Sequence, residues 1–135
     1  MKILIIDGQG GGLGKALISA LKSASSTLEI IAVGTNSIAG SAMKKAGADI
    51  VATGENAVIV NSRKADIIAG PLGIIAADAL YGEITPAMAA AIAQSDATKI
   101  LIPFNSCGIF VVGVAEKTAF SQMINEAVQK ILSLC

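Results

Sequence analysis

Residues 3–15 read ILIIDGQGGGLGK, and this stretch decides the fold class. Four apolar residues in a row predict a buried strand, which Asp7 ends. Five of the seven residues from Gly8 to Gly14 are glycine. From Leu13 onward apolar residues recur at steps of three and four, which is one face of a helix. A strand, a glycine turn and a helix start form the usual backbone cradle for a phosphate or another anion.

The length predicts a single domain that spans residues 1–135. The composition indicates that this domain has more apolar surface than one small core can bury. Of the 135 residues, 53% are hydrophobic and only 15% are charged, against about 25% charged in an average soluble protein. Residues 74–80 carry one polar side chain, Asp78, and residues 88–93 carry none. We expect two helices that are apolar on every side there, and such helices are buried. The sequence therefore predicts a sheet covered on both faces and a homo-oligomer.

Charge and composition also limit the partners. The net charge is zero and no basic run is present, so we expect no nucleic-acid partner. No uninterrupted apolar stretch reaches the roughly 18 residues of a membrane span, and the first one lacks the form of a signal peptide. We expect no membrane partner, a cytoplasmic location and, with two cysteines, no disulfide framework.

Strand and helix patterns alternate along the whole chain. The expected strands are 2–6, 28–33, 49–52, 66–69, 99–102 and 109–114. The expected helices are 13–24, 37–47, 55–62, 71–81, 86–95 and one that begins near Lys117. This alternation is typical of a three-layer, Rossmann-like, doubly wound α/β sheet that is mostly parallel. Right-handed crossovers favour the strand order 3-2-1-4-5-6. Only about six residues separate strand 109–114 from strand 99–102. This is too few for a crossover between parallel strands, so strand 109–114 should be an antiparallel edge strand.

The first five strands all end in small or polar residues. In an open parallel sheet those ends share one rim, where ligands bind at the point of strand-order reversal. The loops 23–27, 62–64 and 96–98, at the opposite ends of the strands, carry no glycine. The candidate ligand-binding residues are Gly8, Gln9, Gly10, Gly11, Gly12, Leu13, Gly14, Gly34, Thr35, Asn36, Thr53, Gly54, Glu55, Asn56, Gly70, Pro71, Gly73 and Asn105.

The glycine loop is compatible with two nucleotide-binding patterns. Gly8, Gly12 and Gly14 match the G-x-x-x-G-x-G spacing of short-chain dehydrogenases, whose glycines let the backbone approach a pyrophosphate. Residues 10–15, GGGLGK, also resemble a deviant Walker loop, although Ala16 replaces the hydroxyl that would hold magnesium. The cofactor stays open: NAD(P) or another nucleotide would fit such a loop.

Other features of the sequence narrow the chemistry. No acidic residue follows the second strand, where a ribose hydroxyl would be held, and Thr35 and Asn36 stand there instead. Glu55 is the candidate to hold a ribose or act as a base. The chain contains no histidine, which excludes a Ser-His or Cys-His nucleophile and a histidine-rich zinc site. Thr85 stands four residues after Tyr81, so the Tyr-x-x-x-Lys of short-chain dehydrogenases is missing.

Several strings together resemble a small uncharacterised bacterial family of Rossmann-like proteins, catalogued as a domain of unknown function. They are DGQGGGLGK (7–15), GTN (34–36), ATGENA (52–57), GPLGII (70–75) and GEITP (82–86). The resemblance implies a nucleotide-binding-like fold and supplies no substrate, reaction or catalytic residue.

Three functions remain open from the sequence. The first is a binding module that catalyses no reaction. Its ligand would be a small-molecule anion, either a nucleotide or another phosphorylated small molecule. The second is a small reductase- or transferase-type enzyme whose site is completed across an oligomer interface, with polar participants among Glu55, Asn56, Asn105 and Ser106. The third is a non-catalytic interaction protein with an empty rim.

Overall fold

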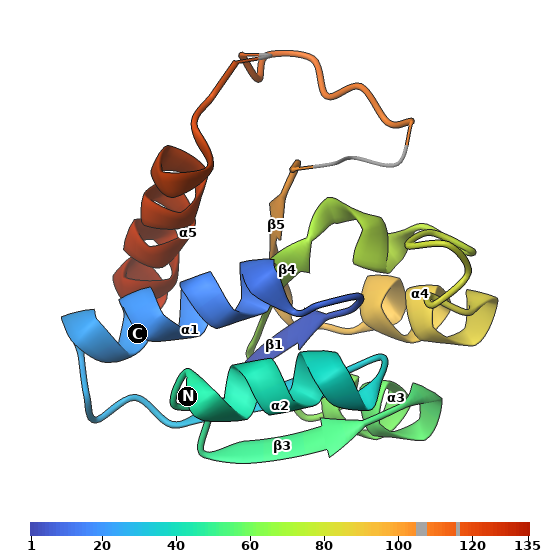
Figure 1. The fold of residues 1–135 in the computed structure, drawn as a ribbon, viewed down its shortest axis with the longest axis horizontal. Coiled ribbons are helices and arrows are strands. Elements are labelled where there is room, and N and C mark those ends of the chain that lie inside the picture. The colour runs from blue at the N-terminus through green and yellow to red at the C-terminus, as the bar shows by residue number, and fades with distance from the viewer. Residues whose placement is uncertain (105–107, 116) are drawn as a thin grey trace.

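The computed structural model describes residues 1–104, 108–115 and 117–135. Its centre is a parallel sheet of five strands in the order β3-β2-β1-β4-β5 (Figure 1). The strands are β1 (Ile3–Asp7), β2 (Ile30–Gly34), β3 (Ile50–Thr53), β4 (Ile67–Pro71) and β5 (Thr98–Ile102). The helices are α1 (Gly12–Ala24), α2 (Ser37–Lys45), α3 (Glu55–Ser62), the 3₁₀ turn η1 (Leu72–Ile75), α4 (Pro86–Gln94) and α5 (Phe120–Leu134). The expected doubly wound class and the order of the first five strands are confirmed.

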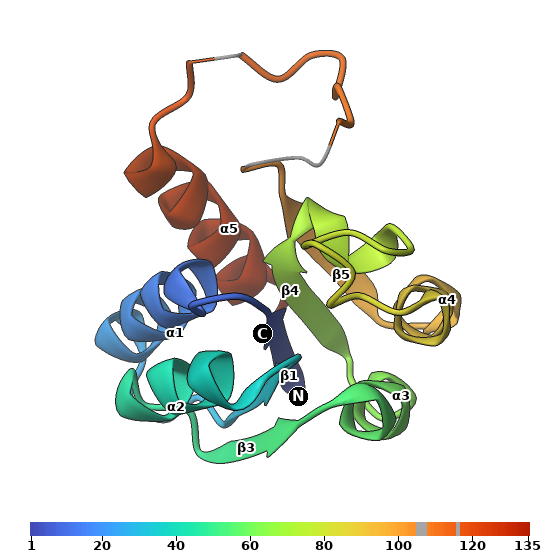
Figure 2. The same ribbon diagram turned by 45° about the vertical axis from the view of Figure 1, so that its right-hand side comes forward.

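Helices cover both faces of the sheet, as Figure 2 shows. On one face, α1, α2 and α5 bury the side chains of alternate strand residues, among them Ile3, Ile5 and Ile30. On the other face, α3, η1 and α4 pack against the remaining positions, including Leu4 and Ile6. Because β1 is covered on both faces, its residues form an apolar run without alternation.

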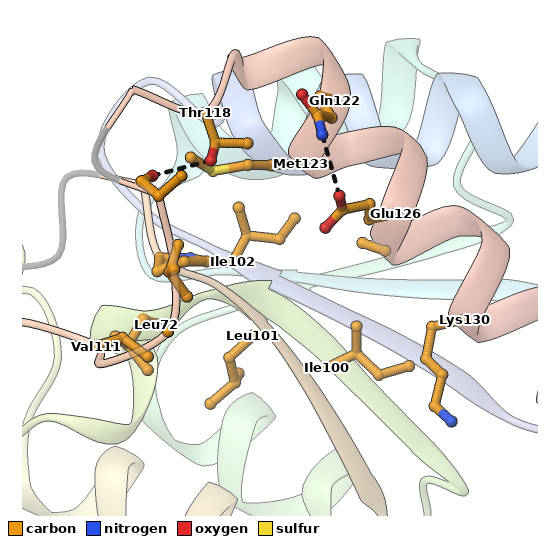
Figure 3. A pocket seen from close by; sticks show the side chains of 15 residues that line it. Leu72, Ile100, Leu101, Ile102, Val111, Thr118, Gln122, Met123, Glu126 and Lys130 are labelled. Carbon is orange, nitrogen blue, oxygen red and sulfur yellow. Dashed lines mark hydrogen bonds between the residues drawn. The ribbon is translucent and has the colours of Figure 1, made fainter.

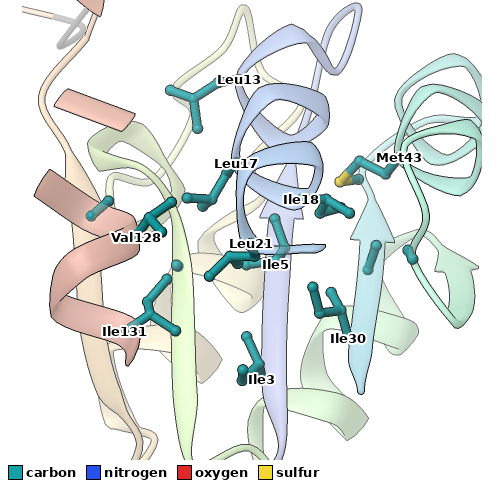
Figure 4. Close-up of a cluster of buried hydrophobic side chains, with 14 of the residues drawn as sticks. Ile3, Ile5, Leu13, Leu17, Ile18, Leu21, Ile30, Met43, Val128 and Ile131 are labelled. Carbon is teal, nitrogen blue, oxygen red and sulfur yellow. The ribbon is translucent and has the colours of Figure 1, made fainter. Parts of the chain in front are cut away.

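The core beneath α1 is built from large aliphatic side chains (Figure 4). Leu17, Ile18 and Leu21 of α1 are fully buried and meet Ile3 and Ile5 of β1. Helix α5 adds its own buried stripe, which consists of Ile124, Ala127, Val128 and Ile131. These contacts fix the start of α1 directly beyond the end of β1.

The segment after β4 differs from its prediction. Residues 71–81 were expected to form a helix with Pro71 in its first turn. Pro71 is instead the last residue of β4, because the pairing with β5 continues to Ile102. Only the short η1 follows, and turns then bring Ile84 into the core. The expected all-apolar helix at residues 74–80 is therefore absent, and in α4 the exposed apolar positions are the small residues Ala87, Ala90 and Ala93.

The expected sixth strand at residues 109–114 is also wrong. The chain there makes turns and has no partner in the sheet among the described residues. Gly108 and Gly113 adopt φ values of 79° and 91°, in the left-handed region, at the two ends of this apolar stretch. A backbone turned at both ends does not run alongside β5. The last helix begins at Phe120 rather than near Lys117.

In the part of the chain that the structure describes, no helix combines the length and apolar character needed to cross a bilayer.

Candidate functional site

All five strands point the same way, so the loops after them share one edge of the sheet. The loops after β1, β2 and β3 are joined there by backbone hydrogen bonds. The Thr35 amide donates to the Asp7 carbonyl at 3.0 Å, and the Gly54 amide donates to the Gly34 carbonyl at 2.9 Å. The structure thus places the glycine loop beside Gly34, Thr35 and Asn36, as predicted.

The side chain of Asp7 binds both ends of the glycine loop. The residue is buried, with 5% of its surface exposed. One carboxylate oxygen accepts the Gly8 amide at 2.8 Å, and the other accepts the Gly14 amide at 2.7 Å. Gly14 lies in the first turn of α1, so Asp7 does the work of an N-cap for a helix whose cap residue, Gly11, has no side chain. The charge of Asp7 is therefore directed into the loop and away from solvent.

Two glycines of this loop are required by its geometry. Gly11 has φ 73°, and a Cβ there would lie 2.8 Å from the Ala39 Cα of α2. A Cβ on Gly14 would lie 2.6 Å from the sulfur of Met43 and 3.0 Å from the Asp7 Cβ. These glycines let α1 approach α2 and the end of β1 closely.

Glu83 is the residue that the sequence did not reveal. It belongs to the loop between η1 and α4, yet its Oε1 accepts three hydrogen bonds above the ends of β1 and β2. The donors are the Gln9 amide at 2.9 Å, the Thr35 hydroxyl at 2.7 Å and the Asn36 side-chain amide at 2.7 Å. The Asn36 amide also donates to the Gln9 carbonyl at 2.9 Å, and its oxygen caps α2 at Ala39. We call Gln9, Thr35, Asn36 and Glu83 the carboxylate cluster.

The two carboxyl groups differ in their ionisation. Burial raises the pKa of Asp7, the amides of Gly14 and Gly8 oppose that shift, and the nearby charge of Glu83 adds to it. Burial also acts to raise the pKa of Glu83, but its bonds to Thr35, Gln9 and Asn36 outweigh this and lower the pKa. Glu83 is thus held as a carboxylate at neutral pH.

The loop that carries Glu83 is conformationally strained. Asp78, Leu80 and Tyr81 all have positive φ, at 66°, 56° and 55°. Non-glycine residues in this region cost of order 1–3 kcal/mol each and persist only where the surroundings hold them. The loop is closed by the Asp78 amide, which donates to the Ile84 carbonyl at 2.7 Å, and by the Ile84 amide, which donates to the Ala79 carbonyl at 3.2 Å. The chain accepts this strain at the point where it delivers Glu83 to the ends of β1 and β2.

Five of the seven amides between Gly8 and Gly14 are used internally, among them the Leu13 amide, which acts on Asp7, and two are not. The Gly8 and Gly14 amides bind Asp7, the Gln9 amide binds Glu83, and the Gly11 amide donates to the Gly8 carbonyl at 2.9 Å. Among the described residues, the Gly10 and Gly12 amides donate no hydrogen bond. A Cβ on either residue would meet nothing within 4 Å. The predicted cradle is therefore reduced to these two amides and the open space beside them.

The other predicted site residues lie at the same edge but farther from this cluster. Thr53 and Gly54 precede α3, and Glu55 and Asn56 are exposed in its first turn on the opposite face from α1. Within the described ranges, no hydrogen bond joins Glu55 or Asn56 to the glycine loop. The acidic side chain above the ends of β1 and β2 is Glu83 rather than Glu55. Gly70, Pro71 and Gly73 are buried at the end of β4, and Asn105 lies outside the described residues.

The signal that could have identified Glu83 is in the sequence. Asp78 and Glu83 are the only acidic residues between Asp66 and Asp96, and Glu83 directly follows a glycine, Gly82. In the structure Gly82 has φ 87°. What the sequence lacks is the fold of residues 76–84, which turns this loop toward β1 and β2.

Comparison with known proteins places the chain in a family. A family model described as a domain of unknown function (DUF3842) matches residues 2–135. The chain belongs to this family. The expected membership of an uncharacterised family is thereby confirmed.

No curated protein matches the chain. Among solved structures, a dodecameric FMN-dependent UbiX-like decarboxylase from Escherichia coli O157:H7 is similar at 16% sequence identity and a TM-score of 0.46. The match covers 99% of this chain and 93% of that one.

Proposed function

We propose that this protein binds a nucleotide-type small molecule at the carboxyl edge of its sheet, with a phosphate on the glycine loop and a ribose at the carboxylate cluster. The observation that carries the proposal is that two amides without a hydrogen-bond partner among the described residues, those of Gly10 and Gly12, lie in the same loop whose Gln9 amide binds the Glu83 carboxylate. An anion bound at Gly10 and Gly12 would meet backbone donors at the N-terminus of α1, where the helix dipole favours negative charge.

Glu83 supports the choice of a ribose. In dinucleotide-binding folds an acidic side chain at the end of the second strand accepts a hydrogen bond from a ribose hydroxyl. Glu83 reaches that position through its bonds to Thr35 and Asn36. One of its oxygens is filled by three donors, and in the part of the chain described, the other has no hydrogen-bond partner. That oxygen is available to a hydroxyl donor.

The same carboxylate sets a selectivity. An ionised Glu83 attracts a hydroxyl and repels a 2′-phosphate, because like charges brought together away from bulk water oppose each other. We therefore infer a ligand with a free ribose, such as NAD, in preference to NADP. The proposal is for binding alone: the Thr35 hydroxyl does donate to Glu83, but the three donors on that carboxylate lower its pKa and make it a weak base.

A thermal-shift screen with NAD, NADP, ATP, GTP, FMN and S-adenosylmethionine tests this function. A ligand at about 100 times its dissociation constant adds roughly 2.7 kcal/mol of stability. For a chain of this size, with an unfolding entropy of about 2.1 cal/mol/K per residue, the melting temperature should rise by roughly 10 °C. We expect such a rise with at least one ligand that carries a free ribose and a smaller rise with NADP. If none of the six ligands shifts the melting temperature, the proposal is wrong.

A matched pair of variants locates the ligand. In Gly12→Val the new side chain enters open space, so the fold should persist while the methyl groups cover the free amides. Ser19→Val places the same side chain on an exposed position of the same helix. We expect the ligand-induced shift to vanish in Gly12→Val and to persist in Ser19→Val. A shift that survives in Gly12→Val would place the ligand elsewhere.

A further inference from the structure

A cavity lies beyond the outer edge of β5, away from the glycine loop. Its volume is about 540 Å³, and its apolar wall comes from Ile100 and Ile102 of β5 and from Met123 and Ala127 of α5. Glu126 and Lys130 of α5 line it as well, as Figure 3 shows. In the described chain β5 pairs only with β4. The cavity therefore runs along a strand edge whose N–H and C=O groups are free to pair.

An apolar segment stands beside this cavity without being buried in it. Residues 108–115, which we call the arm, contain no charged side chain. Phe110 is 70% exposed and Val112 is 88% exposed, and Ile109 and Val114 are each 39% exposed. In Figures 1 and 2 the orange trace of this segment stands away from the sheet and helices. A contiguous exposed apolar patch of this kind marks a contact surface.

The arm fits its own chain loosely. Val111, Gly113 and Val114 touch the mouth of the cavity, while Phe110 and Val112 remain largely in water. A further hollow of about 190 Å³ separates the arm from Pro103 and Met123. Gly108 and Gly113 take left-handed conformations in the arm, and among the described residues the arm forms no sheet pairing with β5 of the same chain. The chain thus contains a strand-forming apolar segment and an open strand edge that do not satisfy each other.

We propose that the arm of one copy lies along the free edge of β5 in a second copy and fills its cavity. The partner is a second copy because each chain offers one arm and one groove, and a reciprocal exchange closes as a two-fold dimer. The arm supplies β-branched and aromatic side chains, which suit a strand added to an exposed sheet edge. The arm carries no charged side chain, so its own burial desolvates no ion.

The area matches what a stable dimer needs. With about 150–250 Å² for a whole aromatic side chain, the exposed side chains of the arm present on the order of 400 Å² in each copy. Two arms and two grooves then bury on the order of 1,600 Å², which is the size of a standard interface. This inference does not depend on the proposed ligand, since the cavity includes no residue of the glycine loop.

Sedimentation of the full chain tests the proposal. At about 100 µM, above the micromolar dissociation constants of weak interfaces of this size, we expect twice the chain mass of 13.5 kDa. Val112→Asp should give the single-chain mass, with its melting curve showing that it is folded. Ile38→Asp is the matched control, since Ile38 is 70% exposed on α2, and it should remain a dimer. A monomeric wild type, a dimeric Val112→Asp or a monomeric Ile38→Asp would overturn the proposal.

Disulfide trapping tests the contact itself. In a chain with Cys107→Ser and Cys135→Ser, one batch carries Val112→Cys and another carries Ile100→Cys. After mixing and mild oxidation we expect a covalent heterodimer, because the arm of one copy reaches the groove of the other. If only Val112→Cys chains join to each other, the arms meet one another and the groove assignment is overturned.

Discussion

At the scale of single residues, Glu83 carries the most weight in the site. Its carboxylate accepts hydrogen bonds from Gln9, which follows β1, and from Thr35 and Asn36, which follow β2. Glu83 itself comes from the loop before α4. Hydrogen bonds to a charged group contribute roughly 1.5–3 kcal/mol each at most, and less where water competes. We therefore attribute to Glu83 both the closure of the loops after β1 and β2 and the recognition of a ligand.

Replacing Glu83 should separate these two roles. Glu83→Gln keeps a carbonyl oxygen for the three donors, so we expect it to lower the free energy of unfolding by about 1 kcal/mol or less. Glu83→Ala leaves all three donors without an acceptor and should cost about 1–3 kcal/mol. Urea denaturation measures both values. Equal losses in the two variants would show that the carboxylate oxygen does not hold the loops together.

The sequence predicts the glycine loop at this scale but not its acid. The glycines and Asp7 lie next to one another in the chain, so their chemistry can be read from one string. Glu83 reaches Gln9 across 74 residues, and that contact depends on the fold of residues 76–84. Glu55 was the predicted acid because it follows β3, and α3 instead carries it to the opposite face from α1.

At the scale of elements, the start of α1 depends on a buried carboxylate. Asp7 binds the Gly8 and Gly14 amides and thereby fixes the end of β1 to the first turn of the helix. The raised pKa of Asp7 means that the folded chain holds its proton more tightly than the unfolded chain does. Ionised Asp7 therefore lowers stability at neutral pH, and acidification through the folded-state pKa relieves this.

Asp7→Asn should change how the stability of the chain depends on pH. The variant keeps one acceptor oxygen and cannot ionise, so the contribution of Asp7 is the wild-type free energy of unfolding minus that of the variant. We expect this difference to grow as the pH falls from 7 toward the unfolded value of 3.8. Denaturant titrations at several pH values measure it. A difference that stays constant or shrinks on acidification would contradict the raised pKa.

Most elements could be predicted, and the exceptions have physical causes. Strongly periodic segments such as α1 and α5 follow from their apolar spacing. The helix expected at residues 71–81 fails because β4 extends to Pro71 and because Asp78, Leu80 and Tyr81 take left-handed conformations that their residue types do not signal. The strand expected at residues 109–114 has the right composition, but it finds no partner within one described chain.

At the scale of the whole molecule, the two proposed surfaces lie on different parts of the sheet. The glycine loop and the carboxylate cluster lie at the ends of β1 and β2, whereas the groove follows β5, which is an edge strand. A dimer formed through β5 therefore leaves the ligand site exposed. The composition predicted a homo-oligomer through helices that are apolar on every side. The exposed arm, rather than such helices, is the surface through which we propose that two copies associate.

The central claim is that the Gly10 and Gly12 amides receive an anionic ligand. The most direct measurement is an ¹⁵N–¹H NMR titration of the labelled chain with NAD, followed residue by residue. We predict that the amide resonances of Gly10 and Gly12 move in a saturable way together with that of Gln9. If NAD and the other five nucleotides leave these resonances unchanged at saturating concentration, the glycine loop is not a ligand site and the account is wrong.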